Sequence, residues 1–208
     1  MTVHGAFMIG GGLSEAQFIN AYQYNVVKGD TLVIPKPSVT VGDMLVLWTL
    51  NSSGVTDTPD AAFTLRKDVG SSVFGAIYTR TINGSEGSTF TFEADKSTGT
   101  YGAILAHMRS AAFDAVGNIS NSSSTAQAPS ITLSKKGKVL AVFGRSQGNN
   151  SFTTPAGFTA SVKIMDPAVT GLSAALFVAD FPAGATGVVA SAASGGTSRG
   201  ILFGAVAP

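Results

Sequence analysis

Few residues in this sequence could carry out chemistry, and they do not form a recognised catalytic pattern. The chain has two histidines, His4 and His107. His107 lies in the apolar segment ILAHMRS, which predicts a core or interface histidine with one hydrogen-bonded nitrogen, whereas His4 is expected at the surface. No serine sits in the G-x-S-x-G turn that presents a hydrolase nucleophile. A Ser-His-Asp arrangement stays open, because the sequence does not show which side chains meet in the fold.

The carboxylates are scattered along the chain. A glycosidase needs two of them across a sugar bond, but Glu86 is expected in a turn and Glu93 is expected to point out of its strand. Asp57 and Asp60 could ligate calcium, or could cap backbone amides of a turn around Pro59. The corresponding later loop, NNSFTTPAGF, has no carboxylate, which argues against a repeated calcium site. We therefore expect no catalytic residue, no metal and no cofactor.

Aromatic side chains offer one further possibility, a platform on which a sugar ring stacks. Trp48, Tyr78, Tyr22 and Tyr24 could form it. However, Trp48 lies within DMLVLWTL, a segment that is apolar on both faces of a strand. Burial of Trp48 in the core is therefore the favoured interpretation.

Composition narrows the classes of partner. Only 12% of the 208 residues are charged, with 13 basic and 12 acidic side chains and a net charge of +1, so no nucleic-acid partner is expected. The chain has no cysteine, so neither a disulfide framework nor a thiolate metal site is expected. No apolar run is long enough to span a bilayer, so no membrane partner is expected. A mean hydropathy of +0.29 with so little charge predicts apolar surface buried between subunits. We expect a homo-oligomer, with a trimer as the first guess.

The elements that would position any site are β-strands. Short apolar runs broken by Gly, Ser, Thr, Asn and Pro every ten or so residues are typical of an all-β sandwich or barrel. The segment LSEAQFINAYQ, from Leu13, fits a short helix with Ser14 in a capping box, but its continuation YQYNVV alternates like a strand, and both interpretations stay open. The predicted strands are Gly5–Ile9, Thr31–Pro35, Met44–Leu50, Ala62–Arg66, Val73–Ile82, Ser88–Ala94, Tyr101–Arg109, Ser130–Ser134, Val139–Gly144, Gly157–Ile164, Leu172–Phe181, Thr186–Ala190 and Gly200–Val206.

The chain also resembles itself. GDMLVLW at Gly42 recurs as GKVLAVF at Gly137, and five segments recur in the same order at offsets of 95 to 99 residues. This predicts two similar halves, about 31–109 and 130–206, within a single eight-stranded antiparallel jelly-roll-like β-sandwich spanning 31–208. Two tandem small domains are the alternative. The polar segment Asn118–Ser130 would then be a linker instead of a crossing loop.

The N-terminal segment, residues 1–30, lies mostly outside this repeat. It opens with apolar Phe7, Met8 and Ile9, followed by three glycines at 10–12. An apolar group on a flexible hinge suits an attachment arm that contacts a neighbouring subunit. An ordinary first strand of the sandwich is the other interpretation, and it is slightly favoured.

Three further short motifs occur along the chain. They are a P-x-P…x-G-D-x-L-V segment, a P-x-G-[FW]-T loop and an A-P-S-[IV]-T…L-x-V segment. The loop after the first segment departs from the pattern, because TPDAAFTL has no glycine where one is expected. The matching residues are Pro35, Pro37, Gly42, Asp43, Leu45 and Val46 for the first, Pro155, Gly157, Phe158 and Thr159 for the second, and Ala128, Pro129, Ser130, Ile131 and Thr132 for the third.

With these motifs the chain resembles a loose family of tailed-bacteriophage virion proteins. The resemblance implies a jelly-roll-like structural protein at the surface of a phage particle. The first expectation is a non-enzymatic capsid decoration protein bound to the major capsid protein. The alternative is a head or tail fibre component, or a receptor-binding and carbohydrate-binding β-sandwich module. A decoration protein would bind a protein shell through apolar surface, whereas a glycan-binding module would expose aromatic side chains.

Overall fold

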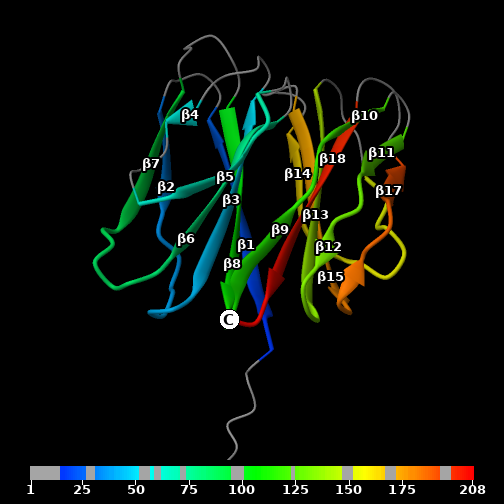
Figure 1. The fold of residues 1–208 in the computed structure, drawn as a ribbon. Helices are drawn as coiled ribbons and strands as arrows, with labels where there is room; N and C mark the ends of the chain where they lie inside the picture. The colour runs from blue at the N-terminus through cyan, green and yellow to red at the C-terminus, as the bar shows by residue number, and fades with distance from the viewer. Residues whose placement is uncertain are drawn as a thin grey trace, which may run out of the picture.

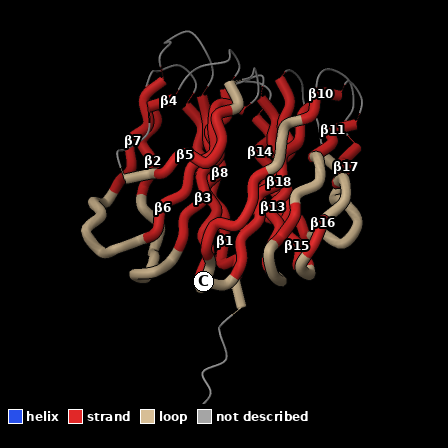
Figure 2. The backbone as a smooth tube through the Cα atoms, viewed as in Figure 1, coloured by secondary structure: helices blue, strands red, loops and turns tan. Residues whose placement is uncertain are grey.

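The computed structural model shows an all-β protein, and among the residues that it describes there is no helix (Figure 1, Figure 2). None of these residues, therefore, belongs to a helix that could cross a membrane. The described residues are 15–26, 31–51, 57–58, 62–70, 74–94, 101–122, 125–146, 152–166, 172–192 and 198–208.

The first half of the chain forms two sheets. A five-stranded sheet, here called sheet A, has the order β1-β8-β3-β6-β5, and a three-stranded cover sheet has the order β2-β7-β4. All pairings are antiparallel. The strands are β1 (Gln17–Val26), β2 (Thr31–Pro35), β3 (Met44–Asn51), β4 (Asp57–Thr58), β5 (Thr64–Asp68), β6 (Phe74–Thr81), β7 (Thr89–Ala94) and β8 (Tyr101–Arg109).

The second half repeats this plan. Its large sheet, here called sheet C, has the order β10-β18-β13-β15-β14, with β9 also paired to β18, and two small antiparallel pairs, β11-β17 and β12-β16, cover it. The strands are β9 (Ala112–Val116), β10 (Ser120–Ser122), β11 (Thr125–Ala128), β12 (Thr132–Leu133), β13 (Gly137–Ser146), β14 (Thr159–Asp166), β15 (Leu172–Phe181), β16 (Gly184–Ala185), β17 (Val189–Ala192) and β18 (Ser198–Val206).

The sheets stack in four layers, with the two large sheets in the middle (Figure 1). Three buried clusters fill the spaces between them. The central core joins sheets A and C and contains Trp48, Val142 and Phe203. The other two cores lie under the cover strands of each half, one around Phe92 and one around Phe177. Each half therefore has its own core, and the central core binds the halves together.

The two halves share their pairing pattern in detail. In the first half the strand pairs are nested, since β1 pairs with β8, β2 with β7 and β3 with β6. In the second half β10 pairs with β18, β11 with β17, β12 with β16 and β13 with β15. Both outer strands, β5 and β14, also carry a bulge at the same place. The bulges fall at Arg66 and Ser161, each three residues after a phenylalanine, Phe63 or Phe158.

The predicted class, an antiparallel all-β sandwich, is confirmed, and three predicted strands match the structure residue for residue: Thr31–Pro35, Tyr101–Arg109 and Leu172–Phe181. The expected number of eight strands is too low. An eight-stranded sandwich built from two halves requires one layer from each half, whereas each half here forms two layers around its own core.

One open alternative is decided, and one further expectation is wrong. The segment that fitted either a helix or a strand is a strand from Gln17 onward, the edge strand β1 of sheet A; Ser14 lies outside the described residues. Strands that are apolar on both faces, such as MLVLWTL and ILAHM, were the faces expected to form the interfaces of the predicted homo-oligomer, but both are buried within the chain. Met44, Leu47, Ile104 and Met108 are at most 2% exposed, because sheet A is covered on both sides.

The segment 118–130, expected as a linker or a crossing loop, contains β10 and β11. Both strands pair with strands near the C-terminus, β18 and β17. This segment is therefore part of the second half.

Candidate functional site

A polar group with several hydrogen bonds, the carboxylate of Asp43, lies immediately before β3. Its carboxylate accepts hydrogen bonds from Arg109 Nε at 2.9 Å and Nη2 at 3.0 Å, and from the backbone N–H of Thr40 at 2.8 Å. His107 Nε2 lies 2.7 Å from Asp43 Oδ2. We call Asp43, His107, Arg109 and Thr40 the Asp43 cluster. Asp43 and His107 are each 2% exposed.

Strand geometry places these side chains together. His107 and Arg109 are two residues apart on β8 and therefore project from the same face. Leu45 on β3 pairs with His107, so Asp43, two residues before it, comes opposite Arg109. The turn that leads into β3 contains Gly42 with φ +92°, a conformation that favours glycine. This turn places Asp43 beside the β3-β8 strand pair.

Hydrogen bonds from Arg109 hold the pKa of the Asp43 carboxyl well below its usual range. Burial opposes this effect, and the Thr40 N–H and His107 add to it. The same contact raises the pKa of Arg109. Asp43 is therefore an ionised, buried carboxylate held by donors on three sides.

This lowered pKa predicts a specific pH dependence. Because the pKa of Asp43 is lower in the folded than in the unfolded state, its charge stabilises the fold above the unfolded value of about 3.9. That contribution is lost as the pH falls below this value. The difference in unfolding free energy between wild type and Asp43→Asn, measured by urea titration, should therefore be largest above about pH 4 and shrink toward about pH 2. A difference that stays constant over this range would contradict the assignment.

The hydrogen bonds of the Asp43 cluster link the turn before β3 to strand β8. His107 has the one hydrogen-bonded nitrogen that the sequence predicted, and its Nδ1 is buried without a hydrogen-bond partner. In a hydrolase triad, the second nitrogen of the histidine accepts a hydrogen bond from the hydroxyl of the nucleophile. Within the described residues, no serine hydroxyl bonds to His107, so no Ser-His-Asp arrangement forms around His107 in this part of the chain.

The other predicted acidic candidates lie apart from this cluster. Glu86 is in the loop after β6, as expected, where its carboxylate accepts hydrogen bonds from the N–H groups of Asn83 and Gly84, both at 2.9 Å. Burial raises the pKa of Glu86, but these backbone bonds and Arg80 outweigh it, so the net pKa is lowered. Glu93 is exposed on β7, as predicted.

The calcium alternative gains no support from the described residues. Asp57 begins β4, and Asp60 lies outside the described residues. Across the described part of the chain, no group of three or more acidic or histidine side chains could hold a metal ion. His4 and the proposed contact residues Phe7, Met8 and Ile9 also lie outside it.

The aromatic candidates do not form a sugar platform. Trp48 is fully buried in the central core, as predicted, with its ring edge-on to Phe203 at 5.8 Å between centroids. Tyr78 is 3% exposed and belongs to the first-half core on the opposite side of sheet A. Tyr22 and Tyr24 are half-buried on β1.

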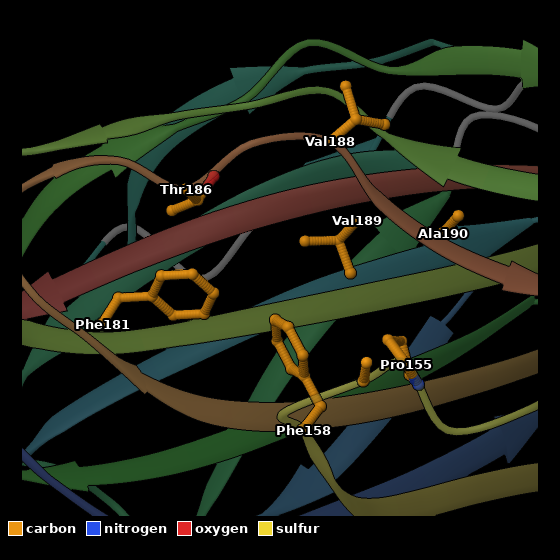
Figure 3. Close-up of a pocket in the computed structure, with 8 residues that line it drawn as sticks. Pro155, Phe158, Phe181, Thr186, Val188, Val189 and Ala190 are labelled. Carbon is orange, nitrogen blue, oxygen red and sulfur yellow. The ribbon is translucent and has the colours of Figure 1, made fainter.

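A surface hollow of about 390 Å³ lies at the second half, beside the P-x-G-F-T motif (Figure 3). We call it the Phe158 hollow. The ring of Phe158 packs on that of Phe181, with 5.7 Å between their centroids. Sequence analysis did not find this hollow, because its walls come from three separated segments. Its lining is Pro155, Ala156, Phe158, Phe181, Thr186, Val188, Val189 and Ala190.

Comparison with known proteins identifies no relative, since no family model, curated protein or solved structure matches this chain.

Proposed function

We propose that this protein is a non-enzymatic structural component of a tailed-phage particle, a capsid decoration protein bound to the major capsid protein at the particle surface. The observation that carries the proposal is the nested strand pairing of both halves. A sheet order β1-β8-β3-β6 facing β2-β7-β4 supports the interpretation of a long hairpin rolled on itself, the topology proposed here as a jelly roll. Jelly rolls recur in viral capsid and lectin domains.

The positions of the resembling motifs support the same proposal. The first motif runs from β2 through the Gly42 turn into β3, and the third runs from β11 into β12, just before β13. These places correspond in the two nested halves. We propose that the halves arose by internal duplication of one jelly-roll unit.

The described surface favours a structural part over a glycan-binding module. The exposed large apolar side chains are aliphatic: Ile19, Val33, Val41, Leu65 and Val188. None of the aromatic side chains that the structure describes is exposed, and stacking on a sugar needs one that is. The fibre or carbohydrate-binding function remains the second candidate because lectins share the jelly roll.

The test is the composition of purified particles of the phage that encodes this protein. We expect the protein in many copies per particle, and we expect it to stay bound in concentrated salt. Binding through apolar surface depends weakly on salt, whereas exposed ion pairs are screened. Quantitative mass spectrometry before and after a high-salt wash measures both.

Absence from the particles, or hydrolysis of a glycan at enzymatic rates, would overturn the proposal. A low copy number together with binding on a glycan array would favour the fibre or receptor-binding function. We also propose a homo-oligomer, with the trimer as the first form to look for. Its contacts must use surfaces other than the buried MLVLWTL and ILAHM faces, and light scattering that shows only monomer at micromolar concentration would contradict it.

A further inference from the structure

We propose that the outer edge of β1 is the surface at which a second copy of this chain adds its own β1 in antiparallel orientation, so that the two copies of Gln23 face each other across a two-fold axis. This contact makes the homo-oligomer proposed above a dimer, in place of the trimer first looked for, and it rests on that part of the proposed function alone. Three features carry it: the open edge of β1, the absence of charge on β1, and the strands that flank it.

Strand β1 ends sheet A, and β8 is its one sheet partner among the described residues. On the other side of an edge strand, alternate N–H and C=O groups point away from the sheet and can pair with another strand. The register of β1 with β8 shifts once, at Ile19, and the pairing is regular from Asn20 to Val26. The centre of this regular stretch is Gln23, whose side chain is exposed.

The edge strand β1 differs in charge from the outer strands β5 and β14. Its sequence, QFINAYQYNV, contains neither a charged residue nor a proline. The opposite edge of sheet A, β5, contains Arg66, Lys67 and Asp68, and the edge strand β14 of sheet C contains Lys163 and Asp166. Charged residues keep an exposed edge from pairing with another chain. The regular stretch of β1 lacks this protection.

The sequence of β1 also suits a second copy of itself. Two uncharged strands meet without like-charge repulsion. Antiparallel pairing about Gln23 places Tyr22 of each copy opposite Tyr24 of the partner subunit, so two tyrosine pairs form. Tyr22 and Tyr24 lie on one face of sheet A, opposite Leu105 and Ala103 of β8, and both are half-buried. Aromatic pairs between neighbouring strands stabilise a sheet.

The strands next to β1 extend this edge into a wall of sufficient size. β1 contacts β2 of the cover sheet and β14 of sheet C, and the Tyr24 hydroxyl donates a hydrogen bond to the Pro35 carbonyl of β2 at 3.3 Å. Packed sheets lie about 10 Å apart, so these three layers span about 20 Å, and β1 is about 33 Å long. The wall therefore approaches the roughly 800 Å² that each partner buries in a stable interface.

Cysteine cross-linking tests the position of the axis, because the chain has no native cysteine. In the proposed dimer, Gln23→Cys places two thiols directly opposite each other, with Cα atoms about 5 Å apart, a separation that a disulfide spans. The matched control is Asn20→Cys, which is also exposed on β1 but whose two copies lie about 20 Å apart along the strands. During oxidation in a glutathione buffer, Gln23→Cys should form a covalent dimer at least about tenfold faster, as measured by non-reducing electrophoresis.

A charge at the same position tests the contact without cross-linking. Gln23→Lys places two cations opposite each other across the axis, which destabilises a strand pair. The control, Gln127→Lys, adds the same charge to an exposed position of β11, which is paired with β17. Sedimentation velocity should show a dimer for the wild type and for Gln127→Lys at micromolar concentration. For Gln23→Lys, the dissociation constant of the dimer should rise at least about tenfold, with an unchanged circular dichroism spectrum.

A wild-type monomer would overturn both this contact and the proposed homo-oligomer. A trimer, or a dimer that Gln23→Lys weakens no more than Gln127→Lys does, would overturn the contact and leave the homo-oligomer standing. Equal cross-linking rates for Gln23→Cys and Asn20→Cys would also overturn it. The copy number in phage particles is measured separately, so failure of the dimer is distinguishable from failure of the decoration function.

Discussion

Replacing Asp43 with alanine should lower the free energy of unfolding by about 1–3 kcal/mol, the usual cost of leaving a buried polar group without its hydrogen-bond partner. The loss stays below that of a fully buried ion pair, because the Arg109 side chain is 44% exposed. The carboxylate is 2% exposed and satisfies donors from Arg109, His107 and Thr40. Without it, His107 is left buried with neither nitrogen bonded, and Arg109 loses its partner. The turn before β3 also loses the contact that anchors it to β8.

The measurement is urea unfolding at neutral pH, followed by far-UV circular dichroism. Asp180→Ala is the matched control, since Asp180 also bonds a basic side chain, Lys138 Nζ at 2.6 Å, but its own side chain is 63% exposed. An exposed pair contributes up to about 1 kcal/mol. If both variants lost the same small free energy of unfolding, the Asp43 cluster would not anchor the turn before β3 to β8.

The strands were predictable from sequence where an apolar run was bounded by turn residues, as at Leu172–Phe181. The strands that were missed lack this signal. Ala112–Val116 alternates little, and Thr125–Ala128 lies in a polar segment that resembles a linker. Both form because a neighbouring strand needs a partner, β18 for the first and β17 for the second. That requirement is tertiary and leaves no local pattern.

The layer that each strand face contacts could not be predicted either, and the reason is related. Strands β3 and β13 are apolar on both faces because both faces of each large sheet are covered. A pattern without alternation does not fix which residues face which layer. The offset of 95 residues aligns Leu45 with Leu140, yet Leu45 belongs to the first-half core and Leu140 to the central core. In β3 and β13, the offset of 95 residues therefore aligns side chains that face different cores.

The Asp43 cluster was partly foreseeable. The sequence predicted a buried His107 with one bonded nitrogen, and the H-x-R spacing places Arg109 on the same face of a strand. What the sequence does not contain is the register that brings Asp43, 64 residues away from His107, opposite this pair. The hollow beside Phe158 was out of reach as well, because its lining comes from segments that are distant in sequence, 155–158, Phe181 and 186–190.

The second large effect concerns the central core. Trp48→Ala should cost about 3–5 kcal/mol of unfolding free energy, since it removes the largest side chain from the contact between sheets A and C and leaves a cavity there. Trp48 is fully buried and lies edge-on to Phe203 of the other half. Its Nε1 has no hydrogen-bond partner, so the loss is one of packing alone.

Because only packing is at stake, the matched control is Trp48→Phe, which keeps an aromatic ring and loses no hydrogen bond. We expect its loss to be clearly smaller than that of Trp48→Ala, with both measured by circular dichroism. In the wild type, Trp48 is the only tryptophan, so its fluorescence reports on the contact between the halves. Fluorescence and circular dichroism transitions should coincide, because the central core joins the two sandwiches into one cooperative unit. A fluorescence change at lower urea, with most circular dichroism signal retained, would instead mean that the halves separate before either unfolds.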